Sequence, residues 1–118
     1  MSYLTLLRPL ILGCIFVWSQ AAHAGELCPS LGQTELIKLA RQRGPLKLVF
    51  FASWCGECLH HLKTANGKNT ILIATFDEKP AVERVIRKLA PKSDCFTDEG
   101  LSTFFKVEAV PTTVEYRL

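Results

Sequence analysis

The chain has 118 residues and a formal net charge of +3 at pH 7, which is enough for one small domain with a single core. Its 14 lysines and arginines are scattered among 11 acidic residues instead of clustering, so the charge pattern argues against a nucleic-acid-binding protein. Part of the 48% apolar content comes from the N-terminal segment and does not indicate a membrane protein.

The N-terminal segment has the pattern of a secretory signal peptide. Arg8 is its only lysine or arginine, residues 10–18 are almost wholly apolar, and Ala22-His23-Ala24 matches a small-x-small cleavage site. The apolar run is far shorter than the roughly 20 residues that span a bilayer. We therefore expect Met1–Ala24 to be removed and residues 25–118 to form an exported domain, periplasmic or secreted.

Two alternatives concern the same segment. Ile11-Leu12-Gly13-Cys14 also looks like a lipoprotein acylation box. Cys14, however, lies inside the apolar run instead of after it, which favours cleavage after Ala24 over lipid attachment. The other alternative is a retained N-terminal anchor.

The expected mature domain begins with a loop, a helix and a buried strand. After a lead-in loop over 25–33, a helix is predicted over Glu35–Arg43, with Thr34 as its N-cap and Gly44-Pro45 as its stop. The continuous apolar run Leu46–Ala52 predicts a strand in the middle of a sheet that is covered on both faces.

The rest of the domain continues this alternation. The remaining predicted elements are, in chain order, a helix over Gly56–Ala65, a strand over Thr70–Phe76, a helix over Ala81–Ala90, a short strand at Cys95-Phe96, a short helix over Leu101–Lys106 and a last strand over Thr112–Arg117. Strands that alternate with helices imply right-handed βαβ crossovers and a layered α/β domain.

Four cysteines follow the predicted signal segment: Cys28, Cys55, Cys58 and Cys95. An even number of cysteines in an exported protein favours disulfides. One pairing that this count allows is a structural disulfide between Cys28 and Cys95. The alternatives are a buried Cys95 with an exposed Cys28, and a Cys28 that pairs with another chain.

The other two cysteines stand in the motif Trp54-Cys55-Gly56-Glu57-Cys58, between a predicted strand and a predicted helix. A cysteine at a helix start lies at the positive end of the helix dipole, where free backbone N–H groups stabilise its thiolate. The motif therefore indicates thiol–disulfide chemistry. The alternative is an inert staple, which two cysteines so close together suit less well.

Further stretches resemble a known family. Phe51-Ala52-Ser53-Trp54-Cys55 leads into the motif, and Asp98-Glu99-Gly100 and the run Phe105–Thr113, with its Val-Pro-Thr-Thr, follow much later. With the Cys-x-x-Cys motif they resemble the thioredoxin superfamily over Leu46–Arg117, and within it the TlpA/ResA/DsbE-like branch. The resemblance implies a thioredoxin-like fold with three layers (α/β/α) and a thiol-disulfide oxidoreductase that needs no cofactor.

The resemblance also implies roles for individual residues. Cys55 would be the exposed nucleophile, and Cys58 would be the more buried resolving thiol that cleaves the mixed disulfide. Pro111 would follow a cis peptide bond and face the two sulfurs, exposing the Val110 backbone for strand-like pairing with substrate. Trp54 would pack beside the site.

Three positions near the motif are candidates for tuning it. The negative charge of Glu57 opposes thiolate formation, which favours reduction or isomerisation over strong oxidation; alternatively, Glu57 is only a helix-N-terminal carboxylate. Many relatives have an acidic proton-transfer residue where this chain has Val49 and a glutamate where it has His61. His61 is thus a candidate proton acceptor, the alternative being a surface histidine.

A metal site is a further alternative for the same motif. Thiolates of Cys55 and Cys58 with an imidazole of His60 or His61 would suit copper(I) or zinc. Because consecutive helical residues point about 100° apart, at most one of the two histidines can join the thiolates. We therefore expect no metal site.

The resemblance also predicts what this domain lacks. Relatives continue past the last predicted strand with a further strand and a C-terminal helix, so the expected domain lacks these two elements. The strand Thr112–Leu118 is then closer to an unprotected sheet edge. It would pair with another subunit, be covered by the N-terminal segment or belong to a truncated product.

Taken together, the sequence predicts an exported thiol-disulfide oxidoreductase that reduces or isomerises protein disulfides. Its partners would be a protein thiol or disulfide substrate and a redox partner, for which a membrane electron donor is one option. The alternatives are a disulfide-forming oxidase, a copper- or zinc-binding metallochaperone, and a non-catalytic thioredoxin-like binding module.

Overall fold

The computed structural model describes residues 26–65 and 67–118. The predicted signal peptide Met1–Ala24, including Cys14, lies outside the described residues. In chain order the elements are β1 (Ser30–Leu31), α2 (Gln33–Arg43), β2 (Leu46–Phe51), α3 (Gly56–Thr64), β3 (Thr70–Ala74), α4 (Lys79–Leu89), β4 (Asp94–Asp98), α5 (Leu101–Phe104) and β5 (Thr112–Tyr116). Within this part of the chain, no helix combines the length and the apolar character that crossing a membrane requires.

The five strands form one mixed sheet in the order β1-β4-β3-β2-β5. The apolar strand β2 pairs in parallel with β3 and antiparallel with β5, so that Val49 lies between Leu72 and Thr113. β4 pairs in parallel with both β3 and β1. The carboxyl end of β2, from which the Cys-x-x-Cys motif continues, therefore lies inside the sheet and not at its edge.

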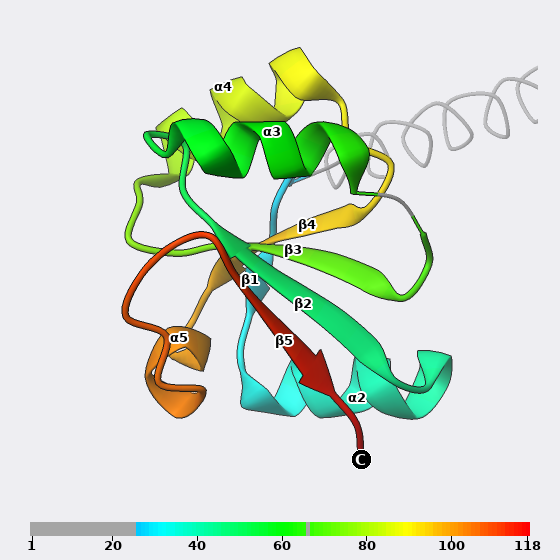
Figure 1. The fold of residues 1–118 in the computed structure, drawn as a ribbon. Helices are drawn as coiled ribbons and strands as arrows, with labels where there is room; N and C mark the ends of the chain where they lie inside the picture. The colour runs from blue at the N-terminus through cyan, green and yellow to red at the C-terminus, as the bar shows by residue number, and fades with distance from the viewer. Residues whose placement is uncertain (1–25, 66) are drawn as a thin grey trace, which may run out of the picture.

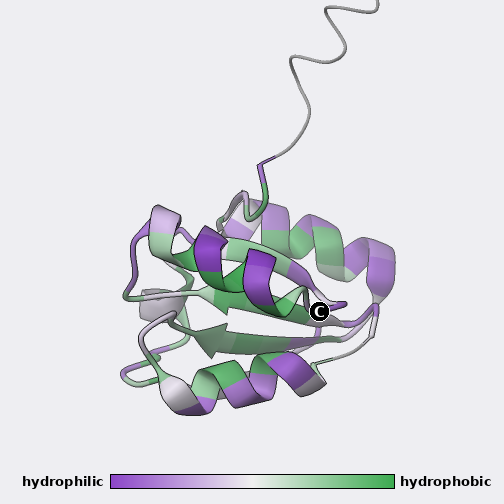
Figure 2. Cartoon of the chain, turned by 90° about the horizontal axis from the view of Figure 1, so that it is seen from above, coloured by the Kyte–Doolittle hydropathy of each residue, from purple (hydrophilic) through white to green (hydrophobic). Residues whose placement is uncertain are grey.

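Helices cover both faces of the sheet. α3 and α4 lie on one face, and α2 and α5 lie on the other (Figure 1). The three long helices, α2, α3 and α4, turn their apolar sides toward the strands and their polar sides outward (Figure 2). Two separate core clusters form, one on each face of the sheet. The chain is thus a compact α/β domain with a mixed sheet, and the predicted α/β class is confirmed.

The predicted start of the first helix was wrong. α2 begins at Gln33, and its N-cap is Gly32, so Thr34 lies inside the helix and does not cap it. The Gly32 carbonyl accepts the Leu36 N–H at 3.0 Å, and the backbone of Gly32 is extended, as an N-cap requires. A Cβ at Gly32 would lie 3.2 Å from the Glu35 carboxylate, a close contact that this exposed side chain can relieve by a small shift.

The lead-in loop contains a strand that the sequence did not predict. Ser30–Leu31 pairs in parallel with Thr97 and Asp98, which extends β4 beyond the predicted Cys95-Phe96. Two residues are too few to show any hydrophobic period, which is why β1 was missed. The third strand, by contrast, is shorter than predicted, since it ends at Ala74.

Candidate active site

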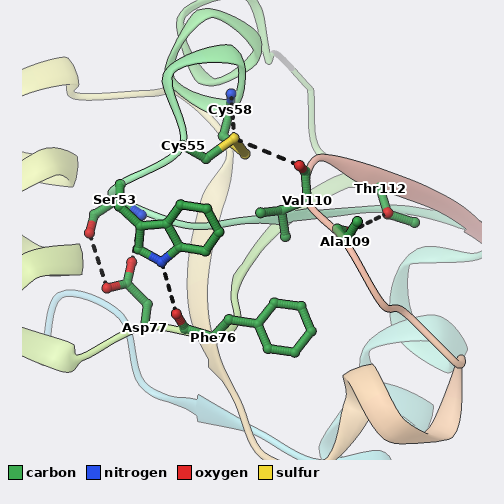
Figure 3. Close-up of a disulfide and its surroundings, with 9 residues drawn as sticks. Ser53, Cys55, Cys58, Phe76, Asp77, Ala109, Val110 and Thr112 are labelled. Carbon is green, nitrogen blue, oxygen red and sulfur yellow. Dashed lines mark hydrogen bonds between the residues drawn. A yellow bond between two sulfur atoms is a disulfide. The ribbon is translucent and has the colours of Figure 1, made fainter.

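The two motif cysteines lie where β2 passes into α3. Cys55 is the N-cap residue of α3, and Cys58 lies in its first turn, with their Cα atoms 5.2 Å apart. The two sulfurs form a disulfide (Figure 3). The Cys55 Sγ also accepts the Cys58 backbone N–H at 3.1 Å, so one of the free donors of the helix N-terminus already points at this sulfur.

The two sulfurs differ in burial, although both are largely covered. Cys55 is 8% exposed and Cys58 is fully buried. Cys58 is the more buried of the two, as expected. Cys55, however, was expected to be exposed and is nearly buried. An attacking partner can reach the pair only through the small exposed surface of Cys55.

The loop before β5 faces this disulfide. The Val110 carbonyl oxygen lies 3.8 Å from the Cys55 Sγ (Figure 3), and the Val110–Pro111 peptide bond is cis. Thr112 Oγ1 donates to the Ala109 carbonyl oxygen at 2.6 Å and holds the turn at the start of β5. The structure thus brings Val110 and Pro111 to the cysteines, from which they are remote in sequence.

An aromatic surface lies beside the disulfide. Trp54 is 65% exposed, and its Nε1 donates to the Phe76 carbonyl oxygen at 2.9 Å. Phe76 is itself 49% exposed and has a positive φ of 55°. Trp54 therefore leaves most of its ring open to solvent next to Cys55, instead of packing closely against the fold.

Asp77 joins the loop after β2 to the loop after β3. Its carboxylate accepts hydrogen bonds from both the backbone N–H and the hydroxyl of Ser53, and from the Glu78 N–H at 2.8 Å. Asp77 is not among the site residues that the sequence predicts. Its position just after a buried parallel strand could have identified it as a site residue, because the carboxyl ends of parallel strands lie at the same edge of a sheet.

The two candidate tuning residues, Glu57 and His61, lie at different positions along α3. Glu57 is exposed in the first turn of the helix. His61 is exposed too, but it lines a cavity of about 150 Å³ together with Val49 and Thr113. The structure therefore brings His61 and Val49 to the same cavity, although they come from a helix and a strand.

The remaining cysteines form a second disulfide. Cys28, just before β1, is bonded to Cys95 in β4, with a Cα–Cα distance of 4.9 Å. Cys28 is fully buried and Cys95 is 7% exposed. Both disulfides belong to the core cluster on the α3 and α4 face, so the structure pairs all four cysteines of its described part.

Asp98, which stands in the Asp-Glu-Gly stretch, has a structural role at the end of β4. Its carboxylate accepts the Thr75 hydroxyl at 2.7 Å and the Leu101 N–H at 2.6 Å, while Gly100 adopts a positive φ of 90°. This part of the resemblance therefore corresponds to a turn that starts α5.

No set of three or more histidine, cysteine, aspartate or glutamate side chains is arranged to hold a metal ion within residues 26–65 and 67–118.

The sequence matches no family model, and no curated protein is similar enough to it to count as a match.

Proposed function

We propose that this protein is an exported thiol-disulfide oxidoreductase with a thioredoxin-like fold, which reduces or isomerises disulfides in other proteins. The observation that carries the proposal is the Cys55–Cys58 disulfide at the N-terminus of α3, with the Val110 carbonyl 3.8 Å from the Cys55 sulfur.

The geometry supports Cys55 as the nucleophile. Once the disulfide is reduced, the Cys55 thiolate lies at the positive end of the α3 dipole, and the Cys58 N–H is placed to donate to it. Cys58 has no exposed surface, so a large substrate can reach only Cys55. Val110 offers backbone polar groups beside the sulfur, to which an extended substrate segment can bind.

The reaction is a pair of thiol–disulfide exchanges. The Cys55 thiolate attacks one sulfur of the substrate disulfide, which forms a Cys55–substrate disulfide and releases the other substrate sulfur as a thiolate. The Cys58 thiolate then attacks the Cys55 sulfur and releases the second substrate thiolate. Two electrons pass to the substrate, whose thiolates take protons from water. A dithiol donor must reduce the Cys55–Cys58 disulfide before the next turnover.

We propose reduction or isomerisation over oxidation because of Glu57. Its carboxylate lies in the first turn of α3, where a negative charge opposes the thiolate and so makes the disulfide a weaker oxidant. Glu57 is exposed, and solvent screening keeps this contribution modest.

Fold family and location belong to the same proposal. A central parallel pair with an antiparallel β5 beside β2, and helices on both faces, support the thioredoxin-like fold. The apolar run and the Ala22-His23-Ala24 site support export by a cleaved signal peptide.

Trapping of substrates tests the proposal. In the C58S variant the resolving thiol is absent, so Cys55-linked mixed disulfides should accumulate with partner proteins in the native compartment and be released by dithiothreitol. The matched C55S variant keeps Cys58 but should trap almost nothing, because Cys58 is fully buried. Equal trapping by the two variants, or none by C58S, would refute the assignment of Cys55 as the nucleophile.

The direction of electron flow is tested by equilibrating the protein with glutathione redox buffers. A reduction potential near or below about −200 mV is expected for a reductant or isomerase, whereas a value near −120 mV would reverse the proposed direction and favour an oxidase.

A further inference from the structure

An open cavity of about 480 Å³ lies between the loops that follow β2 and β3. Its walls come from both loops and from the start of α4: Ser53, Trp54, Phe76, Asp77, Glu78 and Ala81. Trp54 directly precedes Cys55 in the chain, so one wall of the cavity comes from the neighbour of the reactive cysteine.

The large apolar wall of the cavity is the indole of Trp54, because the ring of Phe76 points away from Asp77 (Figure 3). Trp54 and Phe76 are 65% and 49% exposed. Phe76 also has a φ of 55°, a conformation that is unfavourable for a bulky residue. The Trp54 Nε1 hydrogen bond to the Phe76 carbonyl holds this arrangement in place. Exposure of the large Trp54 ring to water is unfavourable in the isolated domain, and a ligand in the cavity would cover this ring.

The charged groups that line the cavity are all acidic. The Asp77 carboxylate is held by neutral donors, the N–H and hydroxyl of Ser53, so its negative charge is not cancelled. Glu78 is exposed at the N-cap of α4 and makes no cap hydrogen bond there. The nearest lysine in sequence, Lys79, does not line this cavity, and its ammonium pairs with Glu26 at 3.0 Å.

We infer that this cavity binds a lysine or arginine side chain of the substrate, next to the substrate cysteine that Cys55 attacks. The apolar stem of such a side chain packs on the ring of Trp54, and its cationic end meets the ring face and the carboxylates of Asp77 and Glu78. The inference rests on the proposed oxidoreductase function and adds to it a class of substrate: protein segments with a basic residue beside the reactive cysteine.

The test uses synthetic peptides that differ only in the residue beside a single cysteine, which is arginine, leucine or glutamate. Each peptide carries its cysteine as a mixed disulfide with 2-thiopyridine, a good leaving group. The Cys55 thiolate therefore bonds to the peptide sulfur and releases thiopyridone, whose absorbance gives the rate. Cys58 then frees the peptide thiol. The rate of each peptide with the reduced protein is divided by its rate with dithiothreitol. This normalisation corrects for differences in intrinsic reactivity between the peptides.

The arginine peptide should react about tenfold faster than the glutamate peptide at low salt, and the ratio should fall as salt screens the charges. The E78Q variant should lower the ratio to about threefold. E83Q is the matched control, because it removes one negative charge from α4 outside the cavity and should leave the ratio unchanged.

Two outcomes separate the inference from the function on which it rests. If the three peptides react at equal normalised rates, or if E78Q keeps the full ratio, the basic-residue site is wrong, while the oxidoreductase proposal stands. If the reduced protein reacts with none of the peptides, both are wrong.

Discussion

Single polar side chains hold the loops of this domain together. Asp77 connects Ser53 to the start of α4, and Asp98 connects Thr75 to the start of α5. Thr75 is 3% exposed, so its hydroxyl depends on Asp98 for a hydrogen-bond partner. A buried hydroxyl that loses its partner costs more than the hydrogen bond alone, since it can no longer be hydrated.

The D98A variant should therefore lose about 2 to 3 kcal/mol of unfolding free energy, through the unpaired Thr75 hydroxyl and the uncapped start of α5. The midpoint of urea unfolding measures this loss. E99A, at the exposed neighbouring position, should change stability by no more than about 0.5 kcal/mol. Similar losses in the two variants would contradict the role of the Asp98 carboxylate.

At the scale of elements, helix ends depend on glycine in different ways. Gly56 is the first residue of α3, and a Cβ at this position would meet nothing within 4 Å. Gly100 precedes α5 with a φ of 90°, where a Cβ is also free of neighbours but the backbone conformation is unfavourable for an L-residue. Both sites therefore have room for an alanine side chain, and they differ only in backbone conformation.

This difference predicts opposite effects of the same substitution. G56A should raise the free energy of unfolding by about 0.5 kcal/mol, because alanine loses less entropy than glycine in a helix. G100A should lower it by about 1 kcal/mol or more, because alanine is strained at positive φ. Thermal unfolding of both variants under one set of conditions checks the signs, and a stabilised G100A would contradict the argument.

In the whole molecule, the two disulfides share one core cluster but constrain very different lengths of chain. Cys28 and Cys95 are 67 residues apart in sequence, whereas Cys55 and Cys58 are 3 apart. The longer link fastens the segment before β1 to β4, at the side of the sheet remote from β5. Since β1 has only two residues, few backbone hydrogen bonds hold this segment otherwise.

Removal of the Cys28–Cys95 disulfide should therefore lower the free energy of unfolding more than removal of the Cys55–Cys58 disulfide. The C28A/C95A variant should lose roughly 4 kcal/mol of unfolding free energy, and C55A/C58A roughly 2 kcal/mol, if constraint of the unfolded chain dominates. Denaturant unfolding of the oxidised proteins gives both values. A larger loss for C55A/C58A would mean that the Cys55–Cys58 link acts mainly as a structural staple, which would weaken the proposed redox role.

Local patterns in the sequence were enough to predict most of the helices and strands. The apolar run that became β2, the Gly44-Pro45 stop of α2 and the apolar face of α4, with Val82 and Ile86 buried, each lie within a few adjacent residues. The position of Cys55 at a helix start follows from the same kind of signal, because a strand, a motif and a helix are consecutive there.

Contacts between distant residues were decided only by the tertiary structure. The proximity of Val110 to Cys55 was inferred from a resemblance, since no local pattern connects a loop before β5 to α3. The aromatic and acidic cavity arises because parallel pairing of β2 with β3 brings the loops after the two strands together.

The sequence by itself therefore determined the succession of helices and strands and the two cysteines at a helix start, because hydrophobic period, turn residues and helix caps are local properties. The tertiary structure decided the partner of Cys28, the short β1 and the surroundings of Cys55. These depend on which strands pair and in which register, and that choice is made by packing across the whole sheet.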